Sequence, residues 1–188
     1  MEGCELCGIS KDERALDVDH ILPRKHGGTD VMENFQALCW LCNANKAASD
    51  ATDFRRLAES FKARQADCPF CVTSNRNVLT SNSLCYAIRD AHPVTVLHTL
   101  VIPWRHVPDC FGLYSAEWNA MFHLLNEMKA AIAGKDRDVA GFNVGINNGA
   151  SAGQTIFHCH VHLIPRRIGD VANARGGLRN VIPGRADY

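Results

Sequence analysis

Three pairs of cysteines, each with two residues between its members, constrain the fold of this chain more than any other feature of its sequence. In a reducing compartment, pairs at this spacing are typical of metal sites rather than of disulfides. The first two pairs are separated by 31 residues, which predicts one closed four-cysteine zinc site. The pairs are Cys4 and Cys7, Cys39 and Cys42, and Cys68 and Cys71. The other cysteines, expected to be small buried apolar residues, are Cys85, Cys110 and Cys159.

Length and charge set broader limits. The 188 residues suit one or two domains. No segment approaches the roughly 20 apolar residues of a membrane span, and no N-terminal run resembles a signal peptide. We therefore expect a soluble, cytoplasmic protein with no membrane partner. The 20 Lys and Arg balance the 20 Asp and Glu, so overall charge does not indicate nucleic-acid binding.

The chain divides near residue 50. Residues 1–50 contain too few apolar side chains for a core of their own, so metal must hold them together. Within residues 51–66, Phe54, Leu57 and Phe61 recur with helical spacing and predict an amphipathic linker helix. Residues 67–188 form the second predicted domain, with a Gly- and Arg-rich tail.

The second domain has an α+β pattern. Residues 94–103, 141–147 and 155–164 have the composition of buried strands, and Ser115 and Gly134 suit the start and end of a helix. The pattern predicts an antiparallel sheet with one packed helix. The helix face expected to be apolar carries Trp118, Met121, Phe122, Leu125, Met128 and Ile132.

Three histidines, His158, His160 and His162, alternate along the last predicted strand. Alternate side chains of a strand point to one face, so the three imidazoles should share a face. Two interpretations remain open: a metal site, or histidine chemistry on a phosphorus or acyl centre. Cys68 and Cys71 need two more ligands for a tetrahedral zinc ion, and the best candidates are His106 and one histidine of the row.

The loop before the histidines, INNGASAGQT, is rich in Gly, Asn and Ser, so its backbone N–H groups can approach a polyanion. Together with CPFC, HTLVIPWRH, GFNVGIN and HCHVHLIPRR, this loop resembles the histidine triad (HIT) superfamily of nucleotide hydrolases and nucleotidyl transferases over residues 68–188. The resemblance implies a HIT-like fold. It also implies that this chain forms a homodimer, as HIT relatives do.

The HIT resemblance implies a division of roles among the site residues. His160 would attack the α-phosphorus of a nucleotide and form a covalent nucleotidyl intermediate, while His162 and His98 stabilise charge on the phosphate. Asn147 and Gln154 would donate hydrogen bonds to phosphate oxygens, and Asp90 would accept from the ribose. Asp90 also suits a turn cap, and His98 an ordinary strand position. The implied zinc ligands are Cys68, Cys71, His106 and His158.

The first two cysteine pairs frame a second resemblance. The segment VDHILPRKHGGTDVMENFQALC and the following WLCNANK resemble the HNH endonuclease family, whose ββα-metal module is small and treble-clef-like. The resemblance implies that Asp19 and Asn43 hold one Mg²⁺ or Mn²⁺ ion, that His20 activates water, and that Asn34 fixes the loop. Residues 1–60 carry seven basic and eleven acidic side chains, so a non-cleaving binding module is as well supported as a nuclease.

Two enzymatic hypotheses follow. The first is a HIT hydrolase or transferase acting on a purine nucleotide, with adenine favoured, such as a dinucleoside polyphosphate or an AMP conjugate. In this hypothesis the N-terminal module binds or cleaves nucleic acid. The alternative is a metal-dependent HNH DNA endonuclease or DNA-end deadenylase, with the HIT domain processing or sensing nucleotides. A third hypothesis is a zinc-stabilised binding protein that uses neither site.

Overall fold

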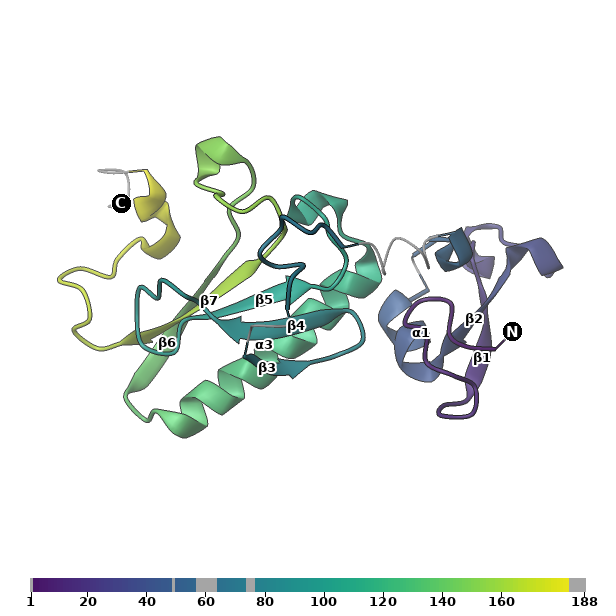
Figure 1. Cartoon of the computed structure of the whole chain (residues 1–188), viewed down its shortest axis with the longest axis horizontal. Coiled ribbons are helices and arrows are strands. Elements are labelled where there is room, and N and C mark those ends of the chain that lie inside the picture. The colour runs from purple at the N-terminus through teal and green to yellow at the C-terminus, as the bar shows by residue number, and fades with distance from the viewer. Residues whose placement is uncertain (1, 49, 57–63, 74–76, 183–188) are drawn as a thin grey trace.

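The computed structural model describes residues 2–48, 50–56, 64–73 and 77–182. Two sheets lie side by side in Figure 1, a two-stranded sheet near the N-terminus and a five-stranded sheet formed by the rest of the chain. No helix in the described part of the chain has the length and apolar character needed to span a bilayer. The central part of the predicted linker helix, residues 57–63, lies outside the described residues, and the described part of 51–66 contains only a short 3-10 turn at Phe54–Arg56.

The N-terminal module is a hairpin followed by a short helix. Strand β1 (Leu16–His20) pairs antiparallel with β2 (Phe35–Cys39), and α1 (Trp40–Lys46) begins at the residue after β2. Two short 3-10 turns, Arg24–His26 and Met32–Asn34, lie in the connection between the strands. This is the predicted ββα arrangement.

The larger sheet is antiparallel throughout, with strand order β3-β4-β5-β7-β6. Helix α3 (Ser115–Lys135) packs against β4, β5 and β7. The strands are β3 (Val78–Ser81), β4 (Cys85–Arg89), β5 (Thr99–Pro103), β6 (Val139–Gly145) and β7 (Val161–Arg167). The remaining 3-10 turns are Cys110–Gly112, Ala150–Ala152 and Gly177–Val181.

Side-chain alternation gives this sheet two different faces. On β5, Val101 belongs to the core beneath α3, while Leu100 and Ile102 pack with the Cys68–Cys71 segment on the opposite face. His162 of β7 lies opposite Leu100 in the register, so its imidazole is on the face away from α3. The sheet therefore places the histidine chemistry and the third cysteine pair, Cys68 and Cys71, on one side.

Two strand predictions began too early. We expected strands at 94–103 and 155–164, but β5 begins at Thr99 and β7 at Val161. Leu97 has a positive φ of 69° that turns the chain just before β5. Before β7, the Cys159 N–H donates to the Val107 carbonyl at 2.7 Å, so a loop rather than a strand binds this backbone. His158 and His160 thus precede the strand that was expected to contain them.

The helix prediction was also partly wrong. Tyr114, not Ser115, occupies the cap position, and its N–H donates to the Glu117 carboxylate at 2.9 Å. The helix continues past Gly134 to Lys135. Met121, Met128 and Ile132 are buried as predicted, whereas three other residues of the expected face, Trp118, Phe122 and Leu125, are exposed or half-buried.

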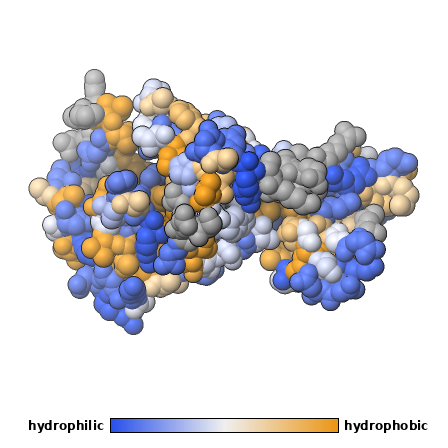
Figure 2. Space-filling view, in the orientation of Figure 1, coloured by the Kyte–Doolittle hydropathy of each residue, from blue (hydrophilic) through white to orange (hydrophobic). Residues whose placement is uncertain are grey.

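The two parts of the chain share one hydrophobic core. Helix α1 packs against α3, and the Asn119 side chain donates to the Asn45 carbonyl across the contact. Leu38 and Phe54 belong to the same buried cluster as Met121 of α3. Figure 2 shows that the visible face of the N-terminal part, on the right, is mainly hydrophilic. This shared core compensates for the small size of the module.

Candidate functional site

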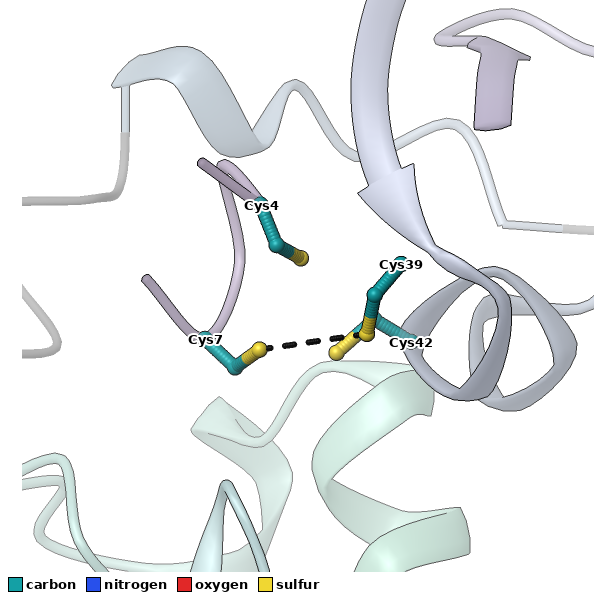
Figure 3. Close-up of side chains that lie close together, drawn as sticks. All are labelled: Cys4, Cys7, Cys39 and Cys42. Carbon is teal, nitrogen blue, oxygen red and sulfur yellow. Dashed lines mark hydrogen bonds between the residues drawn. The ribbon is translucent and has the colours of Figure 1, made fainter. Parts of the chain in front are cut away.

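The first two cysteine pairs converge on one point. Cys39 ends β2 and Cys42 lies in α1, while Cys4 and Cys7 come from the N-terminal loop (Figure 3). Their four sulfur atoms lie within 4.8 Å of one another, and the Cys7 and Cys39 Sγ atoms are 3.9 Å apart. Zinc–sulfur bonds of about 2.3 Å in a tetrahedron place sulfur atoms about 3.8 Å apart. The geometry therefore fits a closed zinc site.

The third pair is completed by two histidines. The Nδ1 atom of His158 lies 3.4 Å from Cys68 Sγ and 3.6 Å from Cys71 Sγ, and His106 Nδ1 lies 3.4 Å from Cys71 Sγ. A tetrahedral zinc ion sets sulfur–nitrogen separations of about 3.5 Å. The four side chains are brought together as the HIT resemblance implied, and their geometry fits a second zinc ion.

His158 has the protonation state that a metal ligand needs. Its Nε2 atom lies 2.9 Å from the Pro103 carbonyl, which only accepts, so the proton is on Nε2 and Nδ1 keeps its lone pair toward the cysteines. The ring is fully buried, and burial lowers its pKa to about 4. Imidazole in this position is therefore neutral and oriented for metal binding.

His160 has the opposite tautomer. Its Nδ1 atom lies 2.8 Å from the backbone carbonyl of His158, so Nδ1 carries the proton and Nε2 has the lone pair. Phe70 contacts the ring edge-on, with centroids 5.1 Å apart, and only 7% of the residue is exposed. A neutral imidazole fixed in this way presents one nucleophilic nitrogen.

His162, His98 and Asp90 form a connected group. His98 Nε2 lies 3.0 Å from His162 Nδ1, and Asp90 Oδ2 lies 3.4 Å from His98 Nδ1 and 3.8 Å from His162 Nδ1. Burial lowers the pKa of His98 and lowers that of His162 to about 4. Asp90 Oδ1 also accepts from the His92 N–H at 2.8 Å, so the turn-cap role is present as well.

The loop before the histidines required one correction. We expected Gln154 to donate to phosphate, but its Nε2 atom donates to the carbonyls of Pro108 at 2.6 Å and Ile156 at 3.1 Å. Its Oε1 atom accepts from the Gly149 N–H at 2.8 Å. The buried amide therefore closes the loop on itself. Asn147 is half-buried in the same loop.

In the N-terminal module, Asn34 and His20 are both held by side-chain contacts. The Asn34 amide donates to the carbonyls of Thr29 at 2.9 Å and Leu22 at 3.1 Å and accepts from the Leu22 N–H. His20 Nε2 lies 2.7 Å from Asp30 Oδ1, and the Arg24 guanidinium pairs with the same carboxylate. Asn34 thus fixes the loop that carries Arg24 and Asp30, the residues that contact His20 or its partner carboxylate.

The structure brings Asp19 and Asn43, the predicted ligands of Mg²⁺ or Mn²⁺, to one pocket, where both already have protein partners. The buried Lys46 ammonium lies 3.1 Å from Asp19 Oδ2, and Gln36 Nε2 donates to the same oxygen at 2.9 Å. Asn43 lines the same pocket but donates to Asp17 Oδ2 at 3.3 Å. Because a fixed cation already neutralises Asp19, a second cation gains little there.

Sequence reasoning missed the partners that fix these groups. Lys46 is 1% exposed, although nothing in its sequence context predicts a buried lysine. Asp30 was not singled out, although it follows the Gly-Gly turn that returns the chain toward His20. Neither the His158 carbonyl nor the Pro103 carbonyl carries a signal in the sequence, because any residue offers a backbone carbonyl.

Comparison with known proteins agrees with this geometry. A family model described as the HIT domain matches residues 73–169, more than half of the chain. The chain belongs to the HIT family. A second model, described as HNH endonuclease, matches residues 4–49.

Three relatives show the extent of the likeness. The chain is 35% identical to "Adenylylsulfatase HINT3" of Arabidopsis thaliana, over 61% of this chain and 60% of that protein. It is 36% identical to the "Bis(5'-nucleosyl)-tetraphosphatase [asymmetrical]" of Schizosaccharomyces pombe, over 50% of each chain. A solved zinc-bound HIT protein of Mycobacterium smegmatis is 32% identical, with a TM-score of 0.52 over 57% of this chain and 80% of that one. The chain thus spans less than two thirds of the first two relatives.

Proposed function

We propose that the HIT domain is a hydrolase or transferase that acts at the α-phosphorus of an adenine nucleotide, with His160 as the nucleophile. The observation that carries the proposal is the 2.8 Å contact of His160 Nδ1 with the His158 carbonyl, which leaves Nε2 as the reactive nitrogen. A histidine in this form attacks without first losing a proton.

The proposed reaction has two displacements. His160 Nε2 forms a bond to the α-phosphorus while the bond from phosphorus to the leaving group breaks, and the leaving group, sulfate or a nucleoside triphosphate for the substrates named below, departs as an anion with the bonding electron pair. Water or another acceptor then attacks the same phosphorus, the phosphorus–nitrogen bond breaks, and the nucleotide leaves. The His162 ring lies 5.0 Å from the His160 ring between centroids, and His98 contacts His162. In the proposed reaction both stabilise the charge on the phosphate oxygens, and Asn147 donates to these oxygens from the loop.

The activities for which two relatives are named support this substrate class. One relative is named for adenylyl sulfate and the other for dinucleoside tetraphosphates, and both names describe cleavage at a nucleotide phosphate. Adenosine is the moiety that we expect both substrates to share here. We assign acceptance from the ribose to Asp90, whose carboxylate contacts His98 and accepts from the His92 N–H.

The test is hydrolysis of adenylyl sulfate and of diadenosine tetraphosphate by the zinc-loaded protein. We expect activity on at least one of them to fall by three orders of magnitude or so in His160→Ala, because removal of a nucleophile leaves only binding effects. His123→Ala removes an exposed imidazole of α3 and is the matched control. Equal activity in His160→Ala and wild type would refute the proposal.

We further propose that both metal sites hold structural zinc. Zinc holds the four side chains of each site in place and takes no part in the chemistry at phosphorus. The zinc-bound Mycobacterium smegmatis relative supports this assignment. Through the His158 ligand, the second site fixes the backbone carbonyl that orients His160.

For the N-terminal module we propose nucleic-acid binding rather than cleavage. Its likeness to the HNH endonuclease model supports a nucleic-acid partner. Cleavage would need a hard cation beside Asp19, where Lys46 already lies. Incubation of supercoiled plasmid with Mg²⁺ or Mn²⁺ should therefore give no nicking above that of His20→Ala.

We also propose that the chain forms a homodimer through α3 and β6. Phe122 is 65% exposed and Val144 is 44% exposed, and with Leu125 and Phe142 they line an apolar hollow of about 530 Å³. Strand β6 is an edge strand of the sheet. A contiguous apolar surface beside a strand edge is typical of a subunit interface.

A further inference from the structure

A pocket of about 530 Å³ lies in the N-terminal module. Helix α1 forms one wall with Trp40, Asn43 and Ala44, and the β1 end and following turn form the other with His20 and Pro23. The pocket thus combines one large aromatic ring and small apolar side chains with the polar side chains of His20 and Asn43, and Asp19 and Arg24 also line it.

Trp40 is held firmly yet remains open to solvent. It is the first residue of α1 and directly follows Cys39, a residue of the cysteine cluster, so its backbone is fixed by the metal clip. Its exposed fraction is 59%, far above that expected for a tryptophan that serves the core. The Arg14 guanidinium lies 6.0 Å from the ring centroid. The ring is therefore a rigid apolar surface with a cation beside it.

The carboxylates around the pocket are paired with basic groups. Lys46 binds Asp19, and Arg24 binds Asp30. Pairing removes much of the repulsion that two open carboxylates would exert on a phosphate chain, but it also engages the two basic groups. With seven basic and eleven acidic residues in positions 1–60, phosphate contacts alone give this module little affinity for a duplex.

We propose that this pocket binds an unpaired base of single-stranded nucleic acid, which stacks on the Trp40 indole. His20 and Asn43 face the edge of the base and supply hydrogen bonds to it. The inference rests on the proposed nucleic-acid partner of the N-terminal module and specifies that this partner is single-stranded. Stacking on an aromatic side chain tolerates any base and needs few phosphate contacts, which suits a module of this charge.

The test compares binding of a labelled single-stranded oligonucleotide and of its duplex to the zinc-loaded full chain by fluorescence anisotropy. We expect Trp40→Ala to weaken single-strand binding about tenfold or more, and Trp40→Phe to retain most of it. Phe111→Ala is the matched control because Phe111 is an aromatic residue of the HIT domain that is 85% exposed. We also expect a shallow salt dependence, with log Kd changing by about one to two per log unit of salt.

Each outcome bears on the inference. Wild-type preference for the single strand, lost in Trp40→Ala alone, supports it. If the wild type binds duplex as tightly as single strand and Trp40→Ala changes neither, the inference fails while the nucleic-acid partner stands. If the wild type binds neither, both fail, and hydrolysis by the HIT domain is tested independently through His160.

Discussion

At the scale of single residues, His158, His160 and His162 differ in the contact made by the second ring nitrogen. His158 donates from Nε2 to the Pro103 carbonyl, His160 donates from Nδ1 to the His158 carbonyl, and His162 meets another imidazole, that of His98. The alternation of the histidines is visible in the sequence. Their separate chemistry is not, because it depends on backbone carbonyls and on residues far away in the chain.

The pKa of His162 predicts how stability depends on pH. Burial lowers this pKa from 6.5 to about 4. Between these two pH values the imidazole binds a proton in the unfolded chain but stays neutral in the folded one. The contribution is complete above pH 6.5 and is lost as the pH falls toward 4. Between pH 7 and pH 5 we expect it to lower the free energy of unfolding by about 2 kcal/mol. Urea unfolding of His162→Asn should show a correspondingly smaller loss, and an identical pH profile would contradict this explanation.

The Lys46–Asp19 pair gives a second prediction at this scale. Lys46→Met removes a buried ammonium and leaves the Asp19 carboxylate, 17% exposed, without its cation. We expect a loss of about 3 kcal/mol in the free energy of unfolding, which Asp19→Asn in the same chain should largely restore. The matched control is Lys25→Met, at an exposed lysine, with an expected change of about 0.5 kcal/mol or less. A similar loss of stability in Lys46→Met and Lys25→Met would contradict the stabilising role of the Lys46–Asp19 pair.

At the scale of elements, hydrophobic patterning predicted which face of a strand is buried better than where the strand begins. Cys159, Val161 and Leu163 do belong to the core beneath α3, as their alternation with the histidines predicted. The start of β7 was missed because the backbone near Cys159 binds Val107, a partner distant in the chain. For α3, helical periodicity was right, but it did not separate the buried side from the exposed stripe at Phe122.

That exposed stripe predicts the effect of a substitution on assembly. Phe122→Glu places a charge in the apolar hollow between α3 and β6, so we expect it to convert a dimer into a monomer. Sedimentation velocity measures the change, and thermal unfolding checks that the monomer is folded. Glu127→Ala, an exposed change five residues further along the same helix, is the control. A wild type that is monomeric at all concentrations would contradict the proposed interface.

At the scale of the whole molecule, the two modules are joined by a continuous core. The cysteine cluster that holds β2 and α1 contributes Cys4 and Cys42 to the same buried set as Met121 and Leu124 of α3. The sequence indicated the two modules through their cysteine pairs and histidines. It did not indicate that α1 would pack against α3, because such a contact has no local pattern.

The shared core predicts cooperative unfolding. The intact chain should contain two zinc ions, and Cys39→Ser should remove one of them. Because the N-terminal core is continuous with that of α3, calorimetry of the wild type should show one transition, and Cys39→Ser should lower the melting temperature of the entire chain. Two separate transitions, with the later one unchanged in Cys39→Ser, would show that the modules unfold independently.

We propose that the histidines have separate roles, with His158 as a zinc ligand and His160 as the nucleophile that attacks phosphorus. The most direct test is rapid alkaline quenching of the protein during turnover, followed by mass spectrometry of the peptide that contains residues 153–165. We predict one adenylyl group on His160 in the wild type, none in His160→Ala, and a zinc content that His160→Ala leaves unchanged. Adenylyl on His158 or His162, or equal labelling in His160→Ala, would contradict the account.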